Sequence, residues 1–171
     1  MRRFSFIGSI AAAAALLIAG CGGGGNNNNS NSSASAPAKS PSGNALVNSA
    51  NTASLGDIVV GPNGRTLYLF KKDTGPNSTC SGACAAQWPP LTAKGAVTSS
   101  GSVSMSALKT VRRSDGTMQV TLDGHPLYYY AGDSAPGQAN GQGLNTYGAT
   151  WWALSPSGKE ITVGGGPHGG Y

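Results

Sequence analysis

Cys80 and Cys84, separated by three residues, are the side chains of this sequence best suited to covalent or redox chemistry. In an exported protein such a pair favours a disulfide, which in so short a loop adds about 2 kcal/mol of stability in the chain-entropy model. The spacing differs from the thioredoxin motif, and no histidine follows for haem attachment. Zinc or copper would need further ligands, and the chain holds only His125 and His168 as imidazoles. We predict a structural disulfide, with a redox or metal-handling (copper or respiratory) site as the alternative.

A second candidate group combines an aspartate with aromatic residues and occurs twice. Its members are Tyr68, Phe70 and Asp73 in the first copy and Tyr128, Tyr130 and Asp133 in the second. Paired carboxylates can do acid–base chemistry, but nothing in the spacing brings these two to a common substrate. Calcium would need more oxygen ligands, and no EF-hand spacing accompanies the aspartates. We expect the aspartates to hold turns and the tyrosines to lie in the core; the alternative is a paired aromatic surface for a sugar, a quinone or a peptidoglycan fragment.

Motifs for other chemistry are not found in the sequence. It contains no nucleophile elbow, phosphate-binding loop or zinc-protease helix. The glycine runs 22–25 and 164–166 do not lie between a strand and a capped helix, so they are not phosphate loops. We predict no catalytic residues, no metal ligands and no cofactor, and hence a protein that is not an enzyme. A hydrolase of envelope polymers is a weaker hypothesis.

A duplicated unit must position these residues. Residues 64–77 align without a gap to residues 124–137, and the glycine, leucine, tyrosine, aspartate and proline of the two copies coincide. Similarity at a fixed period marks a repeated supersecondary unit. Asn-Gly and Asp-Gly dipeptides precede the two aromatic runs and are strong hairpin-turn signals. Alternation places Tyr68 and Phe70 on one face of a strand and Leu67 and Leu69 on the other, which indicates an inner strand.

The remaining pattern also favours β structure. Residues 108–112 and 118–122 flank a Ser-Asp-Gly turn and predict a hairpin, while residues 80–88 are the one segment with helical character. We therefore predict a mainly β, single compact domain built from two related β-hairpin or meander repeats, with one short helical segment near the cysteine pair. The repeats are expected at about 55–92 and about 117–161 of a 53–163 domain.

The N-terminus resembles a bacterial lipoprotein signal. Two arginines precede an apolar run that is too short to span a membrane, and the run ends in Ile-Ala-Gly before Cys21. We predict a signal peptide at 1–20, lipid attachment (palmitate among the acyl chains) at Cys21, and a disordered tether rich in Gly, Asn and Ser at 21–52. The Gly-rich tail, 164–171, is expected to be flexible. The predicted location is the bacterial cell envelope, either the outer membrane or the outer face of the cytoplasmic membrane.

The charge of the chain argues against one class of partner. The formal net charge is +5, and two of the arginines lie in the predicted signal peptide. The basic residues are scattered, whereas a nucleic-acid footprint needs a clustered stripe with aromatics between. We predict no nucleic-acid partner, a membrane contact through the lipid anchor, and an envelope ligand or protein partner whose identity stays open.

The two aromatic–aspartate motifs give the chain a family resemblance. Tyr-x-(Phe/Trp/Tyr)-x-x-Asp occurs at 68–73 and at 128–133, and the segment with Cys80, Cys84 and Trp-Pro-Pro-Leu resembles the part between repeats. The chain thus resembles bacterial predicted lipoproteins known as the secreted repeat of unknown function, from about residue 55 to 161. The resemblance implies architecture and location. The function we expect is a non-enzymatic module that binds or organises something in the envelope.

Overall fold

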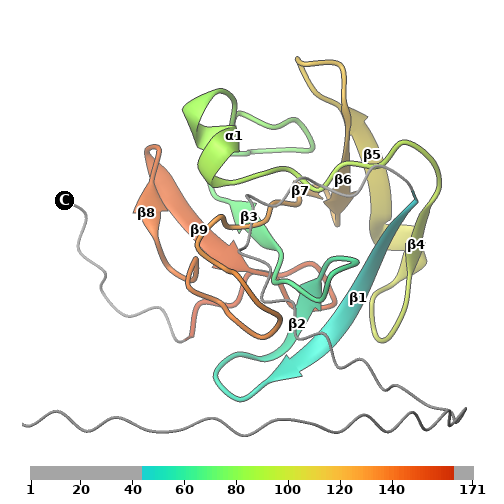
Figure 1. Cartoon of the computed structure of the whole chain (residues 1–171). Helices are drawn as coiled ribbons and strands as arrows, with labels where there is room; N and C mark the ends of the chain where they lie inside the picture. The colour runs from blue at the N-terminus through green and yellow to red at the C-terminus, as the bar shows by residue number, and fades with distance from the viewer. Residues whose placement is uncertain (1–43, 164–171) are drawn as a thin grey trace, which may run out of the picture. The chain divides into compact units, whose positions relative to one another are not determined.

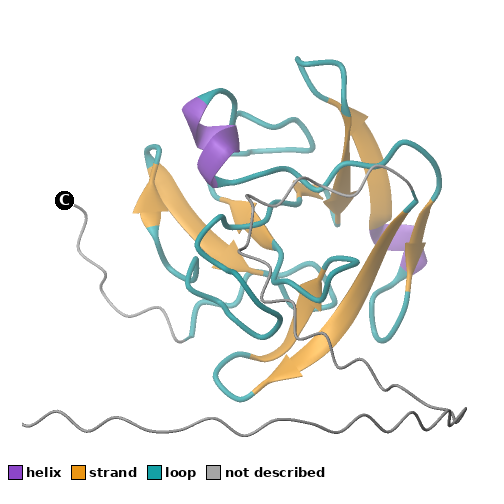
Figure 2. Ribbon diagram, in the orientation of Figure 1, coloured by secondary structure: helices purple, strands orange, loops and turns teal. Residues whose placement is uncertain are grey.

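The computed structural model describes residues 44–163, which lie in one compact unit of the chain and are mainly β. Two antiparallel hairpins are each followed by an aromatic segment, which is a strand in the first repeat and carries only isolated bridges at Tyr128 in the second (Figures 1 and 2). The strands are β1 (Ala45–Thr52), β2 (Gly56–Val60), β3 (Tyr68–Phe70), β4 (Val97–Ser99), β5 (Leu108–Arg112), β6 (Met118–Leu122), β7 (His125–Pro126), β8 (Asn145–Thr146) and β9 (Ala149–Ala153). One α-helix, α1 (Ala83–Gln87), and a 3₁₀ turn, η1 (Met105–Ala107), complete the described elements. The predicted mainly β fold is confirmed, and so is the short helix beside the cysteine pair.

The strands form three small sheets, with the orders β2-β1-β4, β3-β9-β8 and β5-β6-β7 in the described part. β1 pairs antiparallel with β2 and parallel with β4. The hairpin predicted at 108–112 and 118–122 is β5–β6, in which Leu108 pairs with Leu122 and Arg112 with Met118.

β1 corrects the predicted start of the domain. It begins at Ala45, inside the 21–52 segment that we expected to be a disordered tether. The prediction is wrong for residues 45–52. Ala45 and Val47 alternate into the core, at 1% and 0% exposure, but the polar residues that follow them mask the pattern. Residues 1–43, with the predicted signal peptide and Cys21, lie outside the described residues, as does the predicted tail at 164–171.

The two repeats meet where Tyr68 faces Tyr128. The Tyr68 N–H donates to the Tyr128 carbonyl at 2.8 Å, and the Tyr128 N–H donates to the Tyr68 carbonyl at 3.0 Å. This reciprocal pair is an isolated antiparallel bridge between β3 and the segment that follows β7. Exchanging the two residues leaves the pattern unchanged, so an approximate twofold axis passes between them.

The same twofold axis relates other backbone hydrogen bonds of the two repeats. The Leu67 N–H donates to the Val59 carbonyl at 2.9 Å, and the Leu127 N–H donates to the Val120 carbonyl at 3.0 Å. The duplicated sequence is therefore a duplicated structure, in which the β1–β2 hairpin corresponds to the β5–β6 hairpin. The repeats thus include the first strand of each hairpin, which the predicted limits of 55 and 117 left out.

The aromatic strands separate two cores. Leu67 and Leu69 lie in an aliphatic cluster, while Tyr68 and Phe70 lie in an aromatic cluster on the other side of the strand. The run of three tyrosines behaves in the same way: Tyr129 joins the aliphatic cluster, and its two neighbours join the aromatic one. The predicted alternation of faces is confirmed, because strand side chains point to opposite sides of the backbone.

In the part of the chain that the structure describes, no helix has the length and apolar character needed to cross a membrane.

Candidate functional site

The predicted motif residues form two hydrogen-bonded pairs that cross between the repeats. The Tyr68 hydroxyl donates to Asp133 Oδ2, and the Tyr128 hydroxyl donates to Asp73 Oδ2, both at 2.6 Å. All four side chains are buried, with exposures of 4% or less. They lie in the core, as predicted, so they do not present a ligand surface.

The second oxygen of each aspartate closes a loop. Asp73 Oδ1 accepts bonds from the backbone N–H and the hydroxyl of Thr79, both at 2.7 Å. Asp133 Oδ1 accepts a bond from the Asn140 N–H at 2.8 Å. The predicted turn-holding role is confirmed, but the loops closed are longer than the Asx turn that we expected.

Burial governs the titration of these pairs. It raises the pKa of Tyr68 well above the usual range, and the neighbouring Asp133 charge raises it further. Burial likewise raises the pKa of Tyr128, with the Asp73 charge acting in the same direction. Burial also raises the pKa of Asp133, against the opposing effect of its bond from Tyr68. Each tyrosine therefore keeps its proton and acts as a donor.

A column of stacked rings lies beside the two pairs. Trp88 and Trp151 stack face to face with ring centroids 3.9 Å apart. Phe70 stacks on the outer face of Trp151 at 4.0 Å, and Tyr130 packs on Trp88 at 4.5 Å. Aromatic pairs of this kind contribute about 0.5–1.5 kcal/mol each beyond their buried area. The motif aromatics of both repeats are thus core-forming residues.

Cys80 and Cys84 form the predicted disulfide. Their side chains are buried, with residue exposures of 1% and 6%. The guanidinium of Arg113 donates to the Cys80 carbonyl at 2.7 Å, which ties the disulfide loop to the end of β5. The geometry is that of a structural cross-link at the start of α1.

Within the described part of the chain, His125 does not belong to a group of possible metal ligands. His125 is half-buried in β7, and no group of three His, Cys, Asp or Glu residues occurs within the described part. His168 and Cys21 lie outside the described residues.

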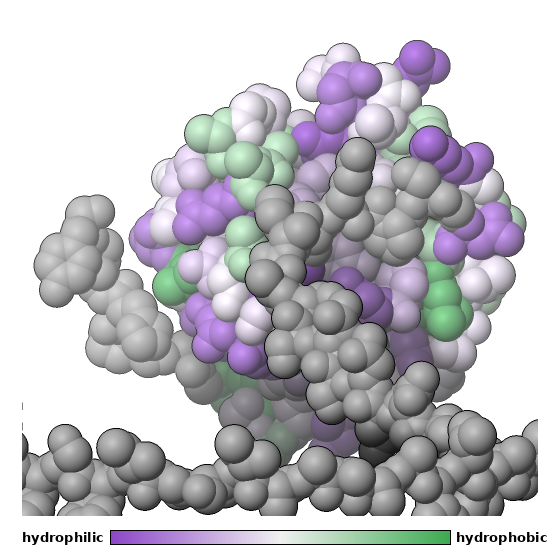
Figure 3. All heavy atoms as spheres, in the orientation of Figure 1, coloured by the Kyte–Doolittle hydropathy of each residue, from purple (hydrophilic) through white to green (hydrophobic). Residues whose placement is uncertain are grey.

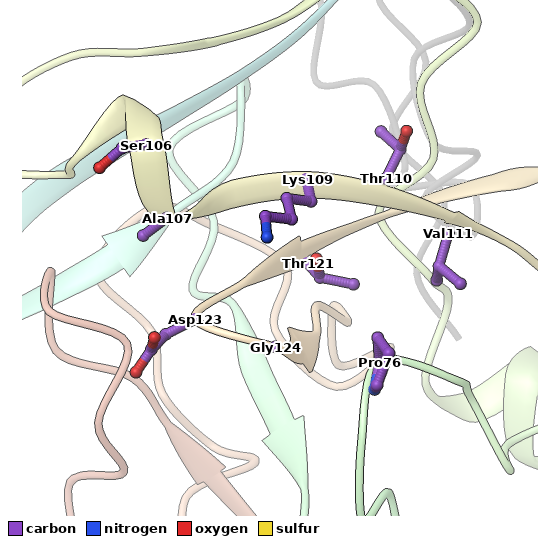
Figure 4. Close-up of a pocket in the computed structure, with 9 residues that line it drawn as sticks. All are labelled: Pro76, Ser106, Ala107, Lys109, Thr110, Val111, Thr121, Asp123 and Gly124. Atoms are coloured by element: carbon purple, nitrogen blue, oxygen red, sulfur yellow. The ribbon is translucent and has the colours of Figure 1, made fainter.

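The remaining candidate is a pocket that the sequence did not predict. Its volume is about 390 Å³, within the range typical of small-ligand sites. It lies on the β5–β6 hairpin, and Figure 4 shows Pro76 approaching from the first repeat. The lining residues are Pro76, Ser106, Ala107, Lys109, Thr110, Val111, Thr121, Asp123 and Gly124.

Three polar groups of the lining have no partner of their own in the described structure. Thr121 is 2% exposed, and its hydroxyl makes no hydrogen bond with a described residue. Lys109 and Asp123 line the same pocket and form no ion pair with a described residue. The Thr121 hydroxyl is not one of the sealed polar atoms without a partner in the described structure, so it stays available to a polar occupant of the pocket.

The twofold axis shows that the corresponding place in the other repeat is closed. Gly64 and Pro136 correspond to Gly124 and Pro76. A Cβ built at Gly64 would lie 3.3 Å from the Pro136 ring, whereas a Cβ at Gly124 would have nothing within 4 Å. One copy of the hairpin is thus packed by its proline, and the other copy is open.

The residues differ as well as the space. In the closed copy Asn48 pairs with Val60 across the hairpin. The corresponding pair in the open copy is Lys109 and Thr121. The closed copy therefore presents an apolar side chain and an amide where the open copy presents a hydroxyl and an ammonium. A comparison of the two hairpins could have revealed this difference, but Lys109 lies before the segment that aligns without a gap.

One family model matches the chain, over residues 49–92 and 109–155, together more than half of its length. Its description is a secreted repeat of unknown function. The chain belongs to this family. The two matched segments of this secreted repeat protein coincide with the two structural repeats, each from its first hairpin strand onward. No curated protein and no solved structure matches the chain.

Proposed function

We propose that this protein is a lipid-anchored module of the bacterial cell envelope that binds a small polar ligand outside the cytoplasmic membrane. The observation that carries the binding role is the pocket on β5–β6, which is open and polar in one repeat and packed shut in the other. Only one of the two repeats therefore leaves room for a ligand at this position. The Thr121 hydroxyl lines the pocket and has no hydrogen bond to a described side chain, so it can bond a polar ligand there.

The chemistry of the lining supports binding rather than catalysis. Catalysis by a nucleophile needs a base within hydrogen-bonding reach. Ser106 and Lys109 are the nearest to such a pair in the lining, and no hydrogen bond joins them. Ser106 is instead bonded to Ser104 at 2.9 Å.

The surface supports a small ligand rather than a broad protein partner. On the face shown in Figure 3, apolar residues occur as separate spots among hydrophilic ones. The large apolar side chains exposed in the described part come from separate segments: Leu46, Met105, Met118, Tyr147 and Val163. Docking faces for protein partners are usually contiguous.

The redox or metal alternative has less support. A redox site needs a reducible, accessible pair, and metal ligation needs free thiolates. Cys80 and Cys84 are joined and buried, which favours a structural bond.

The binding role is tested by NMR on the ¹⁵N-labelled full-length chain in detergent, titrated with a library of small polar compounds. We expect some compounds to shift amide signals confined to residues 106–111 and 121–124. The double variant Lys109→Asn/Thr121→Val, which restores the residue types of the closed copy, should lose these shifts. Lys94→Asn, at an exposed lysine outside the lining, is the charge-matched control. A library in which no compound perturbs these amides would exclude the proposal.

The anchor is tested separately by metabolic labelling. Cells that express the full chain should incorporate radiolabelled palmitate into it, and Cys21→Ala should abolish both the label and the membrane association. Label that persists in Cys21→Ala, or that never enters the wild-type chain, would refute lipid anchoring at this position.

A further inference from the structure

The pocket holds one group of each charge. Lys109 lies on β5, and Asp123 lies in the turn after β6; both are exposed, and no ion pair joins them. A ligand with a single negative charge gains from Lys109 but is opposed by Asp123, and a cation meets the reverse. A ligand that carries both charges gains from each group, and this pairing excludes singly charged competitors.

The spacing of the two groups suits such a ligand. Lys109 is the cross-strand partner of Thr121, and Asp123 follows two residues later. At about 3.3 Å per residue, Lys109 and Asp123 are offset by about 7 Å along the hairpin. Figure 4 shows the Lys109 amine and the Asp123 carboxylate set apart within the same lining, with Thr121 in the same space. One small molecule with separated charges can therefore reach both.

The lining also argues against a sugar. Its apolar contribution comes from Pro76, Ala107 and Val111, and none of the lining residues is aromatic. Trp88 and Trp151 are buried in the aromatic cluster, and Trp152 packs against the aliphatic cluster. The aromatic platform that commonly packs against a sugar ring is therefore missing from this pocket.

We infer that the pocket binds a small zwitterion, a free amino acid or short peptide whose carboxylate meets Lys109 and whose ammonium meets Asp123. The Thr121 hydroxyl donates to the ligand carboxylate or accepts from its amide. The inference rests on the proposed binding function and adds the class of ligand to it.

Four related peptides test the charge requirement on the ¹⁵N-labelled full-length chain. Alanyl-alanine is the zwitterion, its N-acetyl form the anion, its amide the cation, and the doubly capped form is neutral. We expect alanyl-alanine to shift amides at 106–111 and 121–124, and each singly capped peptide to bind at least 10-fold more weakly. The inference would be overturned if a capped peptide bound as tightly as alanyl-alanine or more tightly. It would also be overturned if none of the four peptides shifted these amide signals. If library compounds still bind here, the binding function survives that failure.

Two variants then assign the charges. Lys109→Gln should weaken binding of alanyl-alanine and of the N-acetyl form, and strengthen binding of the cationic amide, because the repulsion from Lys109 is removed. Asp123→Asn should weaken binding of alanyl-alanine and of the amide, and strengthen binding of the anionic N-acetyl form, because the repulsion from Asp123 is removed. Asn accepts the left-handed backbone of position 123, where φ is 49°, so the turn is retained. Lys94→Gln controls for net charge, and a loss that is uniform across all peptides in both variants would contradict the assignment.

Discussion

The Tyr68 hydroxyl donates a 2.6 Å hydrogen bond to Asp133, a residue of the other repeat. The reciprocal bond from Tyr128 to Asp73 has the same length. Each repeat thus supplies donors to one oxygen of its own aspartate, and the tyrosine of the other repeat supplies the donor to the second oxygen. The repeats are therefore interdependent, because separating them would leave two buried carboxylates without their tyrosine donors.

Removing one of these donors should destabilise the fold. Tyr68→Phe keeps the ring but takes the hydroxyl from Asp133, and we expect a loss of about 1–3 kcal/mol in the free energy of unfolding by urea titration. Tyr130→Phe, whose hydroxyl has no hydrogen bond within the described structure, is the matched control and should change stability by less than about 0.5 kcal/mol. Equal effects of the two variants would contradict a special role for the crossed pair.

The same variant should have a pH-dependent effect. Burial raises the pKa of Asp133, and the Tyr68 bond opposes that rise. Without the bond, the folded-state pKa of Asp133 moves higher. The variant therefore loses additional free energy of unfolding at pH values where the Asp133 carboxylate is ionised. Below the unfolded value of about 3.9 both states are protonated and that part of the cost is absent. The stability difference between wild type and Tyr68→Phe should narrow from pH 7 to pH 3; a constant difference would refute this account.

Local patterns in the sequence were sufficient to predict the fold class. Hairpin dipeptides, alternating faces at 67–70 and a repeat at fixed spacing predict a duplicated β domain, and each pattern acts within a few residues. The sequence did not reveal β1 because polar Asn and Ser residues follow Val47 and give this segment the composition of a linker. Its pairing with β2 and β4 cannot be read from composition.

The site was less accessible to the same reasoning. Crossed pairing of Tyr68 with Asp133 depends on where two repeats dock, which no local pattern specifies. The pocket depends on a difference between repeats, at Gly64 and Gly124, rather than on a conserved type of residue at either place. In the sequence, Lys109 and Asp123 look like ordinary surface charges. Only the folded hairpin places them in the lining of one pocket.

The buried tyrosines should make the protein sensitive to alkali. Burial raises the pKa values of Tyr68, Tyr128 and Tyr129 above the unfolded value of about 10. A group with a raised folded-state pKa contributes stability below the unfolded pKa and loses it as pH rises beyond. We expect the free energy of unfolding to fall above about pH 10. Tyrosinate absorbance at 295 nm from these residues should appear together with loss of the β signal in circular dichroism; ionisation of all tyrosines before unfolding would contradict it.

The disulfide should act on stability and not on binding. The double variant Cys80→Ser/Cys84→Ser removes a cross-link over a very short loop, and we expect a loss of about 2 kcal/mol. Mass spectrometry should find the bond intact in protein purified without reducing agents. Amide shifts produced by pocket ligands should persist in the folded fraction of the variant. Selective loss of those shifts would favour the redox or metal alternative.

The two hairpin glycines offer a direct test of the open and closed copies. Gly64 and Gly124 have φ values of 72° and 84°, so alanine at either position carries a similar backbone strain of about 1 kcal/mol. Alanine at Gly64 must also displace Pro136, which would lie 3.3 Å from the new methyl group, whereas alanine at Gly124 meets no atom within 4 Å. We expect Gly64→Ala to lower the free energy of unfolding more than Gly124→Ala does, by chemical denaturation. Equal losses would mean that the two copies are packed alike, and the pocket would lose the asymmetry from which its binding role is argued.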